Sequence, residues 1–326
     1  MATNKRRVMV PSNMGKEGVA ILRARDDIEV ITYPAGITQA ELLPLLGDIS
    51  GIALSATPYR QPELDASPAM QVVARIGVGF DAVEVPALSA RKIPLLTTGI
   101  ANSTSVAEQA VFFIMAIAKR VTEMDAMVKQ GRWNDRFVII PSQLSGKTAL
   151  VVGFGRIGTR SAKRLAALEM NVLVYDPFVP AATITAAGHE AVADLDAVLP
   201  RADYVTIHCP KSPATVDMFD AARLARMKKG AGLVNTARGG IVNEDALYDA
   251  LTSGHLRGAG LDVFDEEPAP ASKKILKLDS VFAAPHMAGV TVESIIGMAM
   301  ATANNILSVL DGKPNRDNVV NKDVLT

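Results

Sequence analysis

The chain has 326 residues, which is too long for one typical hydrophobic core and favours two domains. Lys and Arg together number 34, as do Asp and Glu, and no basic stripe appears, which argues against nucleic-acid and membrane-surface partners. The single cysteine, Cys209, excludes an internal disulfide, and the four scattered histidines predict no metal site. No apolar run approaches the roughly 18 uninterrupted residues of a membrane span, so we expect a cytoplasmic protein.

Short apolar runs rich in β-branched residues alternate with longer amphipathic stretches along the chain. This alternation is typical of parallel sheets flanked by helices. A first series of strands is expected at 7–12, 28–34, 51–57, 71–77 and 93–98, with helices at 38–48 and 81–92. A second series of strands is expected at 147–155, 171–176, 204–209, 231–236, 258–264 and 281–286. The predicted fold class is α/β, with two doubly wound parallel-sheet domains.

Two long helices are predicted outside these series. Residues 105–133 are rich in Ala, Met and Ile, with Ser105 as the candidate N-cap, and we expect this helix to link the domains. Residues 291–312 form the second helix, which Gly312 and the following Pro314 should end. Its place after the last strand would carry the chain back to the first domain.

A glycine-rich fingerprint opens the second series. Gly153, Gly155 and Gly158 have the G-x-G-x-x-G spacing directly after an apolar strand and before a helix. Such glycines permit a tight turn, close approach of the backbone to a pyrophosphate and close helix packing. Asp176 ends the next strand, 18 residues after Gly158, where a carboxylate binds the adenosine ribose and repels the 2′-phosphate of NADP. The pattern predicts an NAD site, and the alternative is a plain strand-to-helix turn with Asp176 as a cap.

Polar residues follow the later strands of the second series, where the carboxyl ends of neighbouring parallel strands share one edge of a sheet. They are Arg238, Asp262, Glu267 and His286. Arg238 suits the binding of a carboxylate, His286 suits proton transfer, and Glu267 suits stabilisation of the imidazolium. Asp262 would then hold the nicotinamide end of the cofactor. Taken singly, each residue is more often an ion pair, a helix cap or a packing residue.

His208 and Cys209 end another strand of this series. The sequence leaves open whether His208 belongs to a cofactor loop or only packs. No neighbouring base would activate Cys209 as a nucleophile, so a structural role or a backbone contact is expected there.

Six motifs lie in order along nearly the whole chain: ARIGVGFDAV, ANSTSVAEQA, GKTALVVGFGRIG, NTARGGIVNEDAL, GAGLDVFDEEP and APHMAG. Together they resemble the D-isomer-specific 2-hydroxyacid dehydrogenases, closest to the short-form D-3-phosphoglycerate dehydrogenases. The resemblance implies a Rossmann NAD-binding domain, residues 103–289, inserted into a flavodoxin-like substrate-binding domain of residues 1–102 and 290–326. It also implies an active site in a cleft and a homodimer formed through the nucleotide domains.

The resemblance assigns roles position by position. The family's catalytic residues fall on Arg238, Glu267 and His286. Its cofactor contacts fall on Val78, Arg156, Ile157, Asp176, Cys209, Thr236, Ala237 and Asp262. The fingerprint glycines Gly153, Gly155 and Gly158, together with His208 and Gly289, complete the candidate cofactor site. Its substrate contacts fall on Ser55, Gly77, Val78, Gly79, Asn102, Arg238 and His286. At Val78 and Asn102 an ordinary turn or loop cap would look the same.

The predicted function is NAD-dependent hydride transfer at C2 of a small 2-hydroxy or 2-keto acid. Leu54 stands where phosphoglycerate-type relatives often carry an arginine, and leucine pairs with no phosphate, although Arg60 or Arg75 would compensate. A hydroxypyruvate or glyoxylate reductase acting on unphosphorylated keto acids is therefore an alternative. A non-catalytic NAD-responsive co-regulator is another alternative. The presence of all three catalytic residue types argues against it.

Overall fold

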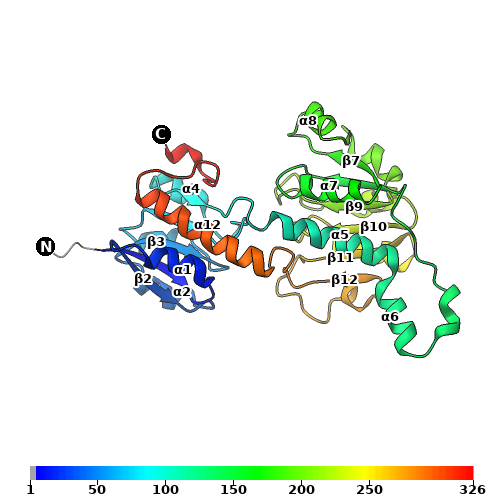
Figure 1. Ribbon diagram of the computed structural model, residues 1–326, viewed down its shortest axis with the longest axis horizontal. Coiled ribbons are helices and arrows are strands. Elements are labelled where there is room, and N and C mark those ends of the chain that lie inside the picture. The colour runs from blue at the N-terminus through cyan, green and yellow to red at the C-terminus, as the bar shows by residue number, and fades with distance from the viewer. Residues whose placement is uncertain (1–4, 326) are drawn as a thin grey trace. The chain divides into compact units, whose positions relative to one another are not determined.

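The computed structural model describes residues 5–325, and the chain divides into two compact units (Figure 1). The first unit contains the residues up to Asn102 and those from Val290 onwards, and the second unit is Ser103–Gly289. Each unit has its own parallel sheet, with a hydrophobic core on both faces of that sheet. The predicted α/β class with two parallel sheets is confirmed.

The first unit is built on a sheet of five parallel strands in the order β2-β1-β3-β4-β5. Its strands are β1 (Arg6–Pro11), β2 (Ile28–Tyr33), β3 (Ile49–Leu54), β4 (Val72–Arg75) and β5 (Leu95–Leu96). Its helices are α1 (Lys16–Arg23), α2 (Gln39–Leu42), α3 (Gln61–Asp65), α4 (Val85–Ala90) and α12 (Val292–Leu310), with 3-10 turns η1 (Leu43–Leu45) and η5 (Lys322–Leu325). This strand order is the flavodoxin-like one.

Alternate side chains of these strands fill the two faces of the sheet. Val8 packs with Ala303 and other residues of α12 on one face, and Met9 packs with Leu42 and Leu88 on the other. Buried strands of parallel sheets are apolar on both faces, which is why the sequence shows them as continuous apolar runs.

Within residues 5–325, α12 is the one helix long and apolar enough to cross a membrane by length and composition. One face of α12, including Met298 and Ala299, is buried and packs on α1, β3 and β4. A core helix passes the same test, so the finding does not argue for a membrane span. The predicted ends are confirmed, because Thr291 caps the first turn and Gly312, with a φ of 72°, follows the last.

The second unit is built on a sheet of seven parallel strands in the order β12-β11-β10-β9-β6-β7-β8. Its strands are β6 (Thr148–Val152), β7 (Asn171–Tyr175), β8 (Glu190–Ala191), β9 (Tyr204–Ile207), β10 (Ala231–Asn235), β11 (Leu256–Leu261) and β12 (Val281–Ala283). Its helices are α5 (Ser103–Lys119), α6 (Val121–Lys129), α7 (Gly158–Ala167), α8 (Ala181–Ala186), α9 (Leu195–Val198), α10 (Ala221–Arg226) and α11 (Glu244–Thr252), with 3-10 turns η2 (Trp133–Phe137), η3 (Leu199–Arg201) and η4 (Lys274–Lys277). The winding reverses between β6 and β9, which is the Rossmann arrangement.

Helix α5 packs on this sheet through glycines of the strands. A Cβ added to Gly260 of β11 would lie 2.5 Å from the Cβ of Phe113, so only glycine permits this approach. The prediction of a single helix capped by Ser105 is wrong in two respects. Helix α5 begins at Ser103, with Ser105 buried inside it, and Arg120, with a φ of 51°, separates it from α6.

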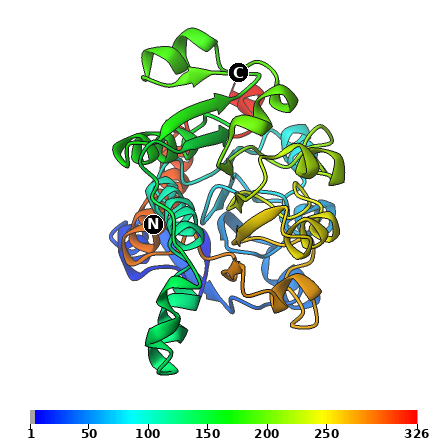
Figure 2. The same cartoon turned by 90° about the vertical axis from the view of Figure 1, so that its right-hand side faces the viewer.

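Helix α6 and the turn η2 extend away from the sheet of their own unit (Figure 1 and Figure 2). We call residues 121–140 the projecting arm. Its exposed apolar side chains are Val121, Val128, Trp133, Phe137, Val138 and Ile140. A group of large exposed apolar side chains on one segment is typical of protein interfaces.

Candidate active site

The glycine loop joins β6 to α7 at the point where the second sheet reverses its winding. Gly153 has a φ of 96°, and a Cβ on it would meet the backbone of His208 and Cys209 at 2.8 Å. A Cβ on Gly158 would lie 1.9 Å from the carbonyl oxygen of Gly153. The packing of the loop therefore requires both glycines, whereas a Cβ on Gly155 would meet nothing within 4 Å. Gly155 is thus the glycine that keeps the backbone open to a ligand.

Asp176 follows β7 next to this loop. Its carboxylate accepts hydrogen bonds from the N–H groups of Phe154 at 2.7 Å and Phe178 at 2.9 Å. The capping interaction considered from the sequence is therefore present. It is compatible with a ribose contact, because each carboxylate oxygen has a second lone pair.

His208 and Cys209 follow β9 and lie against Gly153. The Nε2 of His208 lies 3.0 Å from Thr206 Oγ1, and its Nδ1 is buried without a partner among residues 5–325. Burial lowers the pKa of His208 to about 3 and raises the pKa of Cys209 to about 11. At neutral pH the imidazole is uncharged and the thiol is protonated, so neither group suits acid–base or nucleophilic chemistry.

The other predicted cofactor residues lie on loops of the second unit. Arg156 and Ile157 belong to the glycine loop, and Gly289 is the last residue of the unit. Thr236 and Ala237 follow β10, and the buried Oγ1 of Thr236 has no hydrogen-bond partner within the described part of the chain. A buried hydroxyl without a partner is an available hydrogen-bonding group for a ligand.

The structure brings Glu267 and His286 together. They follow the adjacent strands β11 and β12, and Nδ1 of His286 lies 2.7 Å from Oε2 of Glu267. The other carboxylate oxygen accepts the N–H of Phe264 at 3.0 Å. The side chain of His286 is 50% exposed. An imidazole held at one nitrogen by a carboxylate exchanges protons through the other, which here is Nε2.

Asp262 holds the loop that carries His286. It is 1% exposed, and its two carboxylate oxygens accept the N–H groups of Met287 at 2.7 Å and Ala288 at 2.8 Å. Its carbonyl oxygen accepts the N–H of His286 at 2.8 Å, and His286 has a φ of 55°. Burial raises the pKa of Asp262, and the two backbone N–H groups oppose that shift. The structure thus adds a positioning role that the sequence did not reveal.

Arg238 lies on the loop after β10, the neighbour of β11. Its Nη1 donates to the carbonyl of Ala237 at 2.7 Å. The side chain of Asn235 fastens this loop, because it donates to the carbonyl of Arg238 at 2.8 Å and accepts the N–H of Ala237 at 3.0 Å. A Cβ on Gly239 would lie 1.7 Å from the carbonyl oxygen of Phe264, so the Arg238 loop lies directly against the Glu267 loop. Sequence reasoning missed Asn235 and Gly239, although both stand beside Arg238 in the motif NTARGG.

The predicted substrate residues of the first unit also follow neighbouring strands. Ser55 follows β3, and the turn Gly77–Gly79, which includes Val78, follows β4. Gly77 has a φ of 136°, a conformation that favours glycine. Arg75 holds the turn, since its Nε donates to the carbonyl of Gly79 at 2.8 Å and its Nη1 to that of Leu54 at 3.2 Å.

The sequence singled out three further residues of the first unit in relation to the substrate. Asn102 is 8% exposed, and its Oδ1 has no partner among residues 5–325. Leu54 is fully buried in the core with Met9 and Val73. Arg60 is exposed at the start of α3.

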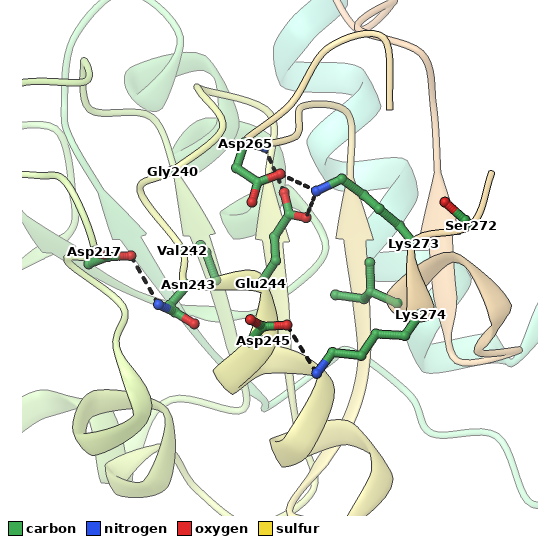
Figure 3. Close-up of a pocket in the computed structure, with 11 residues that line it drawn as sticks. Asp217, Gly240, Val242, Asn243, Glu244, Asp245, Asp265, Ser272, Lys273 and Lys274 are labelled. Carbon is green, nitrogen blue, oxygen red and sulfur yellow. Dashed lines mark hydrogen bonds and ion pairs between the residues drawn. The ribbon is translucent and has the colours of Figure 1, made fainter. Parts of the chain in front are cut away.

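A cavity of about 440 Å³ lies in the second unit beside the Arg238 and Glu267 loops (Figure 3). It is lined by charged and polar side chains of α11 and of the segment after β11, chiefly Glu244, Asp245, Asp265, Lys273 and Lys274. Across residues 5–325 no group of three or more His, Cys, Asp or Glu is arranged to hold a metal ion.

Comparison with known proteins agrees with this geometry. Residues 111–288 match the family model described as the NAD binding domain of D-isomer specific 2-hydroxyacid dehydrogenase. A D-3-phosphoglycerate dehydrogenase of Archaeoglobus fulgidus is 35% identical over 315 residues, which are 96% of this chain and 59% of that protein. A glyoxylate reductase of Thermofilum pendens is 37% identical over 88% of this chain and 86% of that protein.

Among solved structures, a D-lactate dehydrogenase of Aquifex aeolicus, complexed with NAD and lactic acid, superposes with a TM-score of 0.84. The two chains are 25% identical, and the match covers 96% of this chain and 98% of that one. The present chain thus spans about the full length of this structure but about three fifths of the phosphoglycerate dehydrogenase.

Proposed function

Because the chain belongs to the D-isomer specific 2-hydroxyacid dehydrogenase family, we propose that it transfers a hydride between NAD and C2 of a small 2-hydroxy or 2-keto acid. The observation that carries this proposal is the 2.7 Å contact between His286 Nδ1 and Glu267 Oε2. It lies in the part of the chain that matches the family's NAD-binding domain. A carboxylate-bound imidazole at a strand end is the proton donor and acceptor that this reaction needs.

In the proposed mechanism the bound cofactor would supply the hydride to C2 as NADH, and would accept it as NAD in the reverse direction. His286 donates its Nε2 proton to the carbonyl oxygen during reduction and takes it back during oxidation. Glu267 stabilises the imidazolium and fixes the orientation of the ring. Arg238 binds the substrate carboxylate and polarises the carbonyl, a task that suits its planar guanidinium.

The chain's own residues fit the dinucleotide. In the proposal the open backbone at Gly155, with Arg156 and Ile157, receives the pyrophosphate, and Asp176 receives the adenosine ribose. Thr236 offers its hydroxyl and His208 its Nδ1, both of which have no hydrogen-bond partner within residues 5–325. We assign the remaining contacts to the loops around them, namely Gly153, Gly158, Cys209, Ala237, Asp262 and Gly289.

For the substrate we assign the turn Gly77–Gly79 of the first unit, whose N–H groups would receive the carboxylate. Val78 would in addition approach the nicotinamide. Ser55 and Asn102 follow strands of the same sheet and are assigned supporting contacts. The bonds from Arg75 to the Gly79 and Leu54 carbonyls support this assignment, because they order the turn in advance of binding.

A reductase of unphosphorylated keto acids, such as glyoxylate or hydroxypyruvate, is the second candidate. Leu54 favours it, because this side chain is fully buried in the core and offers nothing to a phosphate. Arg75 donates to backbone carbonyls, which leaves the exposed Arg60 as the remaining cation to compensate for Leu54.

Consumption of NADH with a panel of keto acids tests both candidates. We expect turnover with glyoxylate or hydroxypyruvate, and a comparison with 3-phosphohydroxypyruvate decides between them. The same panel with NADPH tests the cofactor. Tight NADH binding by calorimetry without turnover of any keto acid would instead support a non-catalytic NAD-responsive protein.

We also propose a homodimer that uses the projecting arm, whose apolar residues are exposed in the single chain. Light scattering of the purified protein tests it, and replacement of Trp133 and Phe137 by Ser should lower the measured mass to that of one chain. Cytoplasmic location and the lack of nucleic-acid or membrane partners stay predictions.

A further inference from the structure

A charged network lines the cavity beside the Glu267 loop. The Nζ of Lys273 lies 2.7 Å from Oε2 of Glu244 and also contacts Oδ1 of Asp265. The side chains of Lys273 and Glu244 are 15% and 11% exposed. Figure 3 shows Lys273 reaching across to both carboxylates. An ion pair shielded in this way is less screened by water and salt than a surface pair.

The network also accepts hydrogen bonds from the backbone that precedes Glu267. Oε1 of Glu244 accepts the N–H of Asp265 at 2.7 Å, and the side chain of Asp265 accepts the N–H of Glu266 at 2.7 Å. One residue earlier, the N–H of Phe264 donates to Glu267 itself at 3.0 Å. The segment from Phe264 to Glu267 is therefore held by two carboxylates. One is that of Glu267, which accepts the N–H of Phe264, and the other is that of Glu244, which accepts the N–H of Asp265.

Lys274 provides a natural contrast. It is the next residue along the chain and pairs with Asp245, the next residue of α11, at 3.0 Å (Figure 3). The side chains of this pair are 49% and 84% exposed, and among residues 5–325 Asp245 makes no hydrogen bond to the Glu267 segment. Two adjacent lysines thus pair with two adjacent carboxylates, and only the first pair is fastened to the backbone before Glu267.

We propose that Lys273 and Glu244 are positioning residues for the proton-transfer pair, which they act on by fixing the loop that aims Glu267 at His286. The inference rests on the proposed function for its catalytic consequence, but not for its structural one. Side chains that orient a catalytic group from behind typically affect the rate although they touch no substrate. Loosening the loop should weaken the carboxylate's support of the imidazolium, so His286 should lose its proton at lower pH.

The test compares Lys273→Met, which keeps the aliphatic stem and removes the charge, with Lys274→Met as its matched control. The titration of the His286 ring, followed by long-range ¹H–¹⁵N NMR and identified with His286→Ala, reads the pair without any need for turnover. We expect Lys273→Met to move the midpoint of this titration to lower pH by about half a unit or more, and to lower kcat for keto-acid reduction about tenfold. Lys273→Arg should keep the titration midpoint and kcat close to those of the wild type. Lys274→Met should change neither the midpoint nor kcat.

Asp265→Asn, which leaves the Lys273–Glu244 pair in place, provides a second route should Lys273→Met not fold. It should shift the titration in the same direction by a smaller amount. An unchanged His286 titration in the folded variants, or an equal change in Lys274→Met, overturns the proposal. A shifted titration in a protein that turns over no keto acid would support the loop's role and contradict the proposed enzyme activity.

Discussion

The two units share one architecture but place different chemistry at the carboxyl ends of their strands. In the second unit the strand ends carry ionisable side chains, with His286 bound to Glu267 at 2.7 Å and Asp262 buried behind them. In the first unit the corresponding feature is a backbone turn at Gly77–Gly79, held by Arg75. All four histidines and the single cysteine of the chain belong to the second unit.

The contrast indicates which steps of catalysis each unit serves in the proposed enzyme. Side chains whose charge changes during the reaction act mainly in the transition state, so their loss should lower kcat. In the same proposal the turn amides would bind a substrate carboxylate that stays charged throughout, so disturbing them should raise KM. The difference also predicts that the pH dependence of the activity between pH 5 and 7 arises from groups of the second unit.

The largest effect is expected for His286→Ala. Loss of the proton donor should lower kcat for keto-acid reduction by about 10²–10⁴-fold. Binding of NADH, measured by fluorescence titration, should stay close to that of the wild type. His255→Gln is the control, because His255 lies before β11, at the amino end of the sheet. Unaltered turnover in His286→Ala would show that the histidine does not take part in proton transfer. It would also contradict the proposed difference between the two units.

The next effect concerns stability in acid. Burial holds the pKa of His208 at about 3, below its usual value of 6.5, so the folded state favours the neutral ring. The stability that this group contributes is present above pH 6.5 and is lost as the pH falls from there towards the folded-state pKa. The loss is about 1.4 kcal/mol for each pH unit, or roughly 30-fold in the unfolding equilibrium at pH 5.

Hydrogen exchange in urea, read by mass spectrometry at pH 7 and pH 5, separates the two units. Peptides of the second unit should lose protection at pH 5 more than peptides of the first, which has no histidine. His208→Asn should abolish most of that difference. Equal losses in both units would show that the acid sensitivity lies elsewhere.

These predictions depend on features that the sequence revealed unequally. The pairing of Glu267 with His286 was open to prediction, because both follow apolar runs that form neighbouring parallel strands. The contact between Gly239 and Phe264 was not, since it joins two loops whose approach depends on the whole sheet. The break between α5 and α6 left no signal either, because Arg120 adopts a positive φ without a glycine or proline to mark it.

A smaller effect should follow from Arg75→Met in the first unit. The substitution removes the donors to the Gly79 and Leu54 carbonyls, so the turn should be less ordered before substrate binds. We expect KM for the keto acid to rise about tenfold while kcat changes little. Arg60→Met is the control for charge: it should affect a phosphorylated substrate alone. A fall in kcat with unchanged KM in Arg75→Met would contradict the division between the units.

The smallest effect is expected at Asp176. Its carboxylate also accepts hydrogen bonds from backbone N–H groups of the second unit. Asp176→Asn removes the charge but keeps an oxygen for the N–H of Phe154 or Phe178, whereas Asp176→Ala removes both. If the charge excludes the 2′-phosphate, both variants should relax the preference of kcat/KM for NADH over NADPH, by about tenfold or less. If the carboxylate serves only as a cap, Asp176→Asn should keep the wild-type preference, and Asp176→Ala should lose stability. A wild-type protein that prefers NADPH would contradict the ribose assignment, because an anion at this strand end would then lie beside another anion that it repels.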